Sequence, residues 1–197
     1  MAAPFTAAAF ENLLDGRQER WHELRPRLIA GQTQFWSVDR FSYHYIWAGL
    51  LDPVEWLLAE RKRQRMTHDW QGYHELEGQL RVAQGRYAEA LELFAPVLAD
   101  EQFPRLRMHY DVARASHGMG DHDGAILTLE RFEREPMTAL TFGWGTYDWL
   151  RCATLLAEYY LAAGRTADAT RVADRVRALL LLADEEHPLR ARLAALP

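Results

Sequence analysis

The chain has 197 residues and a formal net charge of −5, with 49% apolar and 26% charged residues, the balance of a soluble protein that can bury a core. The acidic charge gives no general reason to expect nucleic acid as a partner, and no apolar run is long enough to span a membrane. A single cysteine, Cys152, excludes an internal disulfide and a cysteine-based zinc site.

The N-terminal third shows helical spacing of its apolar residues, which predicts helices at 6–15, 17–30, 38–50 and 53–65. The first segment, MAAPFTAAAFENLL, lacks the basic start and long apolar stretch of an export signal, so we expect a cytoplasmic protein. The segment RKRQR, residues 61–65, could contact phosphates. It would also form a favourable cationic last turn of a helix, which is the preferred interpretation in an acidic chain.

Aromatic residues are dense between Phe35 and Tyr73. They are Phe35, Trp36, Phe41, Tyr43, Tyr45, Trp47, Trp56, Trp70 and Tyr73. Such rings can fill a core, line a ligand pocket or form the interface of a homodimer. Core packing is favoured, and the homodimer is retained as an alternative.

Three later segments each begin with a glycine and carry an alanine five residues on. The pairs are Gly85/Ala90, Gly120/Ala125 and Gly164/Ala169. Glycine permits a tight turn between antiparallel helices, and alanine lets the partner helix approach closely. The glycines are spaced by 35 and 44 residues, and the longer interval contains MTALTFGWGTYDWL. The pattern predicts helical pairs at 70–84 and 87–100, 105–118 and 121–134, and 145–163 and 166–183.

A large–small pair precedes two of these glycines, and these residues share one helical face with a third residue. They are Val112, Ala113 and Ser116 in one copy and Leu156, Ala157 and Tyr160 in the other. Leu76 and Leu80 are the expected counterparts before Gly85, with one extra residue before the glycine. Pro26 and Pro96 fall inside expected second helices and should kink or end them.

The same phase extends towards the N-terminus. Leu51 lies 34 residues before Gly85, and Gly16 lies 35 residues before Leu51. A tryptophan follows each of them after five residues, Trp56 and Trp21. This match predicts that two diverged pairs occupy residues 1–66.

The tail, EEHPLRARLAALP, begins with acidic residues and a proline suited to the first turn of a helix. We expect residues 184–197 to form a capping helix. Its leucines would cover the open end of the stack, as the last element of a repeat array must. They are Leu189, Leu193 and Leu196.

A period of 34–35 residues built as helix, glycine turn and helix resembles the tetratricopeptide repeat (TPR). The best copy has Gly85, Tyr87, Ala90 and Phe94. The resemblance implies an all-α protein, an α-solenoid of about five antiparallel helix pairs in a right-handed superhelix with a C-terminal capping helix. Residues 1–197 would form a single domain, with three TPR-like repeats in residues 67–183.

The resemblance to TPR proteins also implies that peptides or protein segments bind in a concave groove lined by the first helix of each pair. Helical phase places the exposed positions of these helices opposite the packed side. The predicted peptide-binding residues are Phe41, Tyr45, Trp70, His74, Arg81, Arg107, Tyr110, Arg114, His117 and Arg151. Arginine forks suit carboxylates, so an acidic or C-terminal segment is the expected partner; ordinary solvated arginines and core rings are the alternative.

One histidine–acid cluster could hold a metal: His117, Asp121, His122 and Asp123. It coincides with a glycine turn, where an aspartate is expected to cap the next helix, so we predict no metal and no cofactor. Cys152 is expected to pack rather than react. No phosphate loop, nucleophile elbow or HExxH pair is present, so we expect a binding scaffold and not an enzyme.

Overall fold

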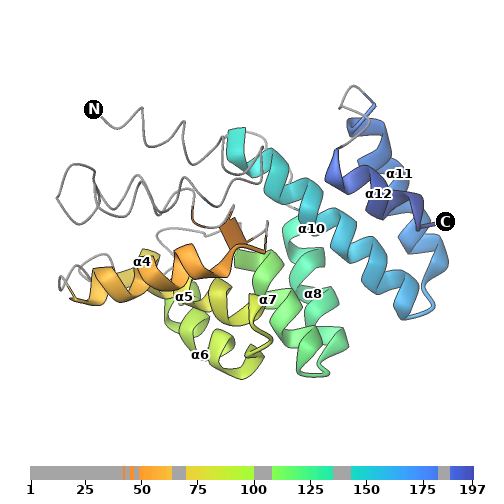
Figure 1. The fold of residues 1–197 in the computed structure, drawn as a ribbon. Coiled ribbons are helices and arrows are strands. Elements are labelled where there is room, and N and C mark those ends of the chain that lie inside the picture. Colours follow the sequence, from red (N-terminus) through yellow and green to blue (C-terminus); the bar gives the residue numbers. More distant parts are fainter. Residues whose placement is uncertain are drawn as a thin grey trace. The chain divides into compact units, whose positions relative to one another are not determined.

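The computed structural model describes the backbone of residues 42, 45–46, 49–63, 70–99, 108–134, 143–181 and 187–197 (Figure 1). These residues contain eight helices and no strand, which confirms the all-α prediction. None of the described helices has the length and apolar character needed to cross a membrane. The helices predicted at 6–15 and 17–30 lie outside the described residues. The chain divides into two compact units, Met1–Val97 and Leu98–Pro197.

The first unit contains α4 (Leu51–Arg63) and α5 (Trp70–Ala83), which pack against each other. The next described helix, α6 (Tyr87–Leu98), follows α5 after a short turn. Buried apolar residues before α4, on α4 and on α5 form one core cluster: Tyr45, Ile46, Val54, Leu57, Leu58, Leu76 and Leu80. The helix α6 continues two residues beyond Pro96, so this proline lies in the last turn.

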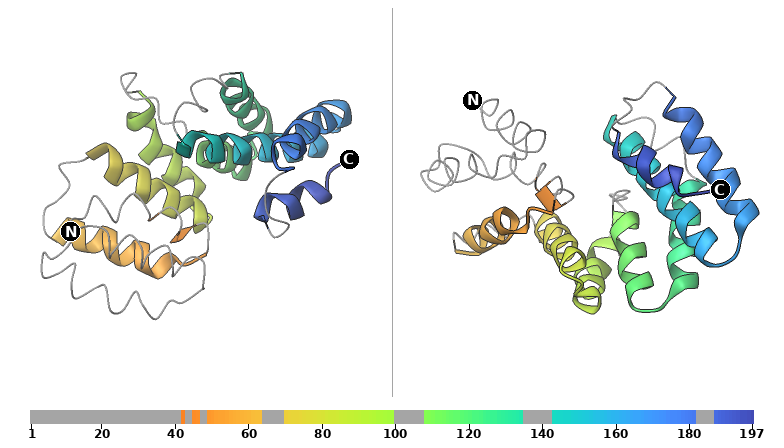
Figure 2. Two further views of the ribbon diagram at one scale, coloured as in Figure 1. Left: turned by 90° about the horizontal axis from the view of Figure 1, so that it is seen from above. Right: turned by 45° about the vertical axis from the view of Figure 1, so that its right-hand side comes forward.

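The second unit contains α7 (Met108–Gly118), α8 (His122–Glu133), α10 (Gly143–Ala162), α11 (Thr166–Leu179) and α12 (Pro188–Ala194). The helices α7 and α8 form one hairpin, and α10 and α11 form the next. The helix α10 also packs on α7 and α8, so the two hairpins stack. Figure 2 shows α12 beside α10 and α11, and α12 packs on both of these helices.

Four turns between consecutive helices share one backbone geometry. Each contains a glycine with positive φ: 74° at Gly49, 73° at Gly85, 87° at Gly120 and 75° at Gly164. The residue after the glycine donates its N–H to the carbonyl five residues earlier: Leu50 to Tyr45, Arg86 to Arg81, Asp121 to Ser116 and Arg165 to Tyr160. This is the Schellman motif that ends a helix. The turns predicted at the three later glycines are confirmed.

The turn at Gly49 corrects the N-terminal register. The predicted match placed Leu51 at the turn and Trp56 in the position of the packed alanine. The structure instead places Gly49 at the turn, and Val54, five residues on, is only 1% exposed. Trp56 is half-buried at the edge of the core. The prediction was wrong because a valine replaces the alanine that marks the later copies.

A second small residue recurs seven positions before each turn glycine. The set is Ser42, Gly78, Ala113 and Ala157, and all four residues are buried. A Cβ atom on Gly78 would lie 2.3 Å from Cε1 of Phe94 on α6, so glycine is required for this approach. The predicted counterparts, Leu76 and Leu80, belong to the core towards α4. With Gly78 as the counterpart of Ala113 and Ala157, the spacing to the turn glycine is the same in all copies, and the extra residue predicted before Gly85 is not present.

The predicted capping helix is present as α12, although it begins later than expected. Pro188 occupies its first turn, and Nδ1 of His187 accepts a hydrogen bond from the N–H of Leu189 at 3.3 Å. Leu189 and Leu193 are buried in the core of the second unit, as predicted, and so is Leu196 just after the helix.

Candidate functional site

The first helices of the hairpins, α5, α7 and α10, carry most of the predicted binding residues. Phe41 and Arg107 lie outside the described residues, and only the backbone of Trp70 is described. In the first unit, His74 and Arg81 are half-buried on α5. In the second unit, the structure brings together Tyr110 and Arg114 of α7 with Arg151 of α10.

Tyr110 is the centre of this group. The guanidinium carbon of Arg151 lies 3.9 Å from the centroid of the Tyr110 ring, and that of Arg114 lies 5.7 Å from it. Both distances allow a cation–π interaction. Each arginine also faces an aspartate of its own helix, Asp111 at 3.7 Å from Arg114 and Asp148 at 3.9 Å from Arg151.

Arg192 of α12, which is not among the predicted residues, completes the group. Arg192 donates two hydrogen bonds to the carboxylate of Glu158 on α10, from Nε at 2.8 Å and from Nη2 at 2.6 Å. Its Nη1 donates to the hydroxyl oxygen of Tyr110 at 3.4 Å. Burial lowers the pKa of Arg192, but the hydrogen bonds and charges of Glu158 and Tyr110 outweigh it and raise the pKa above its usual value. We call Tyr110, Arg114, Arg151 and Glu158 the first-helix face.

Three of the predicted peptide-binding residues were expected to be exposed and are buried instead. Tyr45 is 2% exposed, Tyr110 8% and Arg151 6%. Tyr45 belongs to the core that includes α4 and α5. Tyr110 and Arg151 lie where α7 and α10 pack, because a solenoid helix is covered by its hairpin partner and by the neighbouring repeat. Their predicted role in binding a partner stays a prediction.

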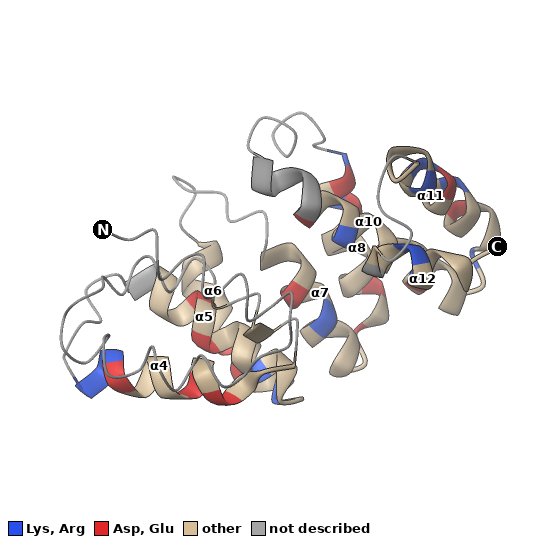
Figure 3. Ribbon diagram, turned by 45° about the horizontal axis from the view of Figure 1, so that its top comes forward, with Lys and Arg blue, Asp and Glu red and all other residues tan. Residues whose placement is uncertain are grey.

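The described arginines among the predicted residues all face carboxylates of this chain. In the first unit Arg81 contacts Glu77 at 2.9 Å and Glu89 at 3.7 Å. Arg114 and Arg151 have Asp111 and Asp148, as above. Charge is balanced elsewhere too, since acidic and basic residues occur together on α4 and α11 in Figure 3.

His117 lies apart from the first-helix face, at the turn between α7 and α8. Its ring stacks on Tyr159 of α10 at 4.2 Å between centroids and lies 4.3 Å from the ring of His122. Burial and then the neighbouring His122 lower the pKa of His117. Oδ1 of Asp121 accepts the N–H of Gly124 at 2.9 Å, which confirms its predicted role as a helix cap.

Among the described residues, no group of three or more histidine, cysteine, aspartate or glutamate side chains is arranged to hold a metal ion. Cys152 is buried in the core of the second unit, which confirms its packing role, and burial raises the pKa of its thiol. Arg61, Lys62 and Arg63 form the last turn of α4, in agreement with the helix-dipole interpretation of RKRQR. Arg61 is buried, and its guanidinium lies 5.5 Å from the ring of Tyr73.

Comparison with solved structures decides between the TPR and an unrelated helical array. A protein from Podosopora anserina, assigned as a kinesin light chain with nearly identical TPR-like repeats, is 21% identical over 92% of this chain and 95% of its own, with a TM-score of 0.54. The chain is built of TPR-like helical repeats. A form of that protein with one glutamine replaced by methionine is 22% identical over 89% of this chain and 92% of its own, with a TM-score of 0.56.

No family model matches the sequence of this TPR-like chain, and no curated protein matches it either. The likeness at this level of identity concerns the fold. The packing explains this likeness in fold, because the recurring turn glycines and small residues let neighbouring helical hairpins pack closely.

Proposed function

We propose that this TPR-like protein is a non-catalytic scaffold that binds a segment of a protein or peptide partner against its first-helix face. The observation that carries the proposal is the contact of α12 with this face. A helical segment of the chain already lies on α10, and its Arg192 bonds to both Glu158 and Tyr110. The face therefore has polar groups that can hold a helix.

We also propose that the bound segment of the partner is acidic or carries its C-terminal carboxylate. Arg114 supports it, because its side chain is 36% exposed and its distance to Asp111 is 3.7 Å, longer than a hydrogen bond. A partner carboxylate at Arg114 would gain a charge-assisted hydrogen bond that Asp111 does not provide at this distance. Arg81 would have to give up Glu77 for the same purpose.

The alternative of a homodimer rests on aromatic residues near 35–47. Of these residues, Tyr45 is buried in the core of the first unit, and the other aromatic ones lie outside the described residues. No contact in the described part of the chain favours this alternative over a foreign partner.

A quantitative pull-down from a lysate of the source cells tests the proposal with a matched pair of variants. Arg114→Ala removes an arginine of a first helix, and Arg171→Ala removes one from the second helix α11. Both arginines follow an aspartate by three residues, at 3.7 Å and 3.5 Å, and their side chains are 36% and 56% exposed. We expect Arg114→Ala to lose captured proteins that the wild type and Arg171→Ala retain, at equal helicity. Equal capture by the two variants would contradict the proposal.

A further inference from the structure

The helix α12 is held by the kind of contacts that an amphipathic helix makes in a groove. Leu189, Leu193 and Leu196 are buried in the core of the second unit. Leu189 and Leu193 stand at positions i and i+4 of the helix, Arg192 stands at i+3 on the same side, and Leu196 follows just after the helix ends. This spacing is the one by which helical peptides are recognised in grooves.

The polar part of this recognition is specific for arginine. Two parallel hydrogen bonds join the guanidinium of Arg192 to the carboxylate of Glu158, a geometry that the single ammonium of lysine cannot reproduce. Tyr110 adds an acceptor oxygen, and the guanidinium carbon of Arg151 lies 3.9 Å from the centroid of its ring. The side chains of Arg192 and Glu158 remain 31% and 32% exposed, so the ion pair is open to exchange with another arginine.

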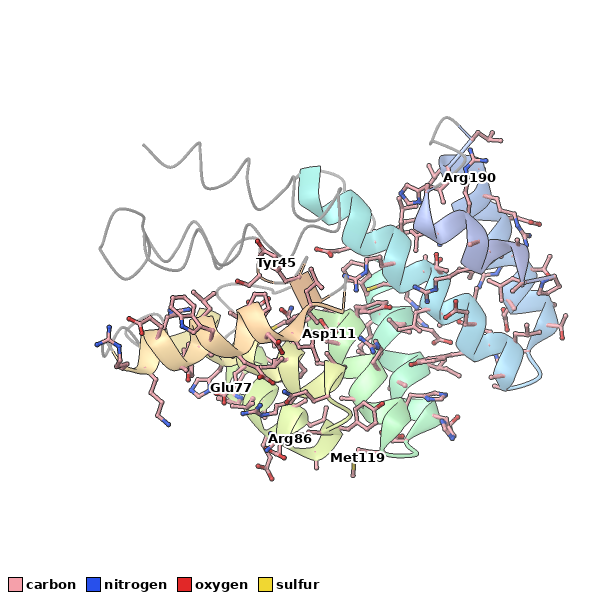
Figure 4. The ribbon with its side chains drawn as sticks, viewed as in Figure 1. Tyr45, Glu77, Arg86, Asp111, Met119 and Arg190 are labelled. Carbon is pink, nitrogen blue, oxygen red and sulfur yellow. The ribbon has the colours of Figure 1, made fainter. Side chains whose placement is uncertain are left out.

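Two further arginines hold the ends of the helices through backbone atoms. Arg177 of α11 donates to the carbonyl oxygens of Leu193 and Leu196 at 2.8 Å. Arg190 of α12, labelled in Figure 4, donates to the carbonyl oxygen of Leu180 at 2.6 Å. The contact of Arg177 would be available to any helix ending at the same place. Discrimination between sequences therefore falls on the leucines and on Arg192.

We propose that Glu158 and Tyr110 form an arginine-binding site, that α12 is its resident occupant, and that a partner segment displaces α12. This segment would be a helix with leucines at i and i+4 and arginine at i+3, followed by a third leucine at i+7. The inference rests on the proposed function and adds an arginine and leucines to the partner segment, apart from the carboxylate that Arg114 would bind. A helix as short as α12, with seven residues, has little stability of its own, so its occupancy depends on these contacts. Its advantage over a partner is the high effective concentration of a tethered segment.

Fluorescence anisotropy with a labelled peptide, HPLRARLAALP, tests the proposal on the full chain. This peptide repeats residues 187–197, and a second peptide carries alanine in place of Arg192. The variant Arg192→Ala weakens the resident helix and leaves the site intact. We expect it to bind the arginine peptide at least about tenfold more tightly than the wild type does, as the loss of a charge-assisted pair implies. It should bind the alanine peptide about tenfold more weakly than the arginine peptide.

Two more variants complete the design. Combining Arg192→Ala with Glu158→Gln should remove the preference for the arginine peptide, while Arg171→Ala should behave like the wild type. If Arg192→Ala does not fold, Arg192→Lys keeps the charge without the paired hydrogen bonds and takes its place. Circular dichroism verifies the helicity of each variant.

Equal binding of the two peptides by the Arg192 variant, or no gain over the wild type, would overturn the proposal. Light scattering that shows a dimer dependent on Glu158 would also overturn it, because the site would then receive α12 of a second copy. A failure confined to the peptides leaves the Arg114 and Arg171 pull-down unchanged, so it refutes the arginine site and not the scaffold.

Discussion

Substituting the glycine of a helix turn should destabilise the protein, because the backbone at these glycines is left-handed. Gly120 has φ of 87°, and no atom lies within 4 Å of the place where a Cβ would stand. Gly120→Ala therefore meets no steric clash with a neighbour, and its cost is that of the left-handed conformation. This cost is about 1–2 kcal/mol for a residue other than glycine. Asparagine tolerates the conformation better, so Gly120→Asn should lie between glycine and alanine.

The control is Gly118→Ala, two residues away at the exposed end of α7. Gly118 is not among the glycines with positive φ, so alanine there should be neutral or stabilise by up to about 1 kcal/mol. Urea denaturation followed by circular dichroism measures the free energy of unfolding of both variants. In thermal unfolding, a change of 1 kcal/mol corresponds to about 2–4 °C in Tm for a chain of this size. Equal effects of the two substitutions would refute the assignment of this turn.

Two further predictions concern packing and pH. Gly78→Ala should destabilise the chain by about 1–3 kcal/mol, because the new methyl group would overlap Phe94, whose Cε1 is 2.3 Å away. Phe94→Leu in the same chain should relieve part of this loss in a double-mutant cycle, and strict additivity would show that the two residues do not meet. Burial and a hydrogen bond to Glu130 raise the pKa of Tyr160 from 10.0 to about 12. The folded state therefore retains the phenolic proton while the unfolded state loses it, so stability should fall as pH rises from 10 to 12. Tyr160→Phe should flatten this slope in urea titrations, and an unchanged slope would contradict the assignment.

Local chemistry explains how much of the fold was predictable. The turns at Gly85, Gly120 and Gly164 were visible because a positive φ selects glycine and close helix packing selects alanine five residues later. Gly49 uses the same turn but is followed by Val54, so the sequence lacked the second mark. Gly78 was missed because Leu76 and Leu80 were matched to the packed residues of the later copies, although Gly78 lies seven residues before Gly85 as Ala113 does before Gly120.

The site was less predictable because it depends on contacts between distant segments. Arg192 lies 34 residues from Glu158 and 82 from Tyr110 along the chain. Helical phase within α7 cannot indicate that α10 and α12 contact Tyr110, so its burial was missed. One signal was present in the sequence, since Arg192 lies three residues after Leu189. This spacing places the arginine on the same side of the helix as the leucines.

Photo-crosslinking tests the central claim, that a partner binds the first-helix face, more directly than any other measurement. Benzoylphenylalanine in place of Arg114 lies on α7, and the same group in place of Arg171 lies on the second helix α11. Irradiation in a lysate of the source cells should give a defined crosslinked protein from position 114 and none from position 171. Crosslinks of equal yield from both positions, or from position 171 alone, would contradict the account.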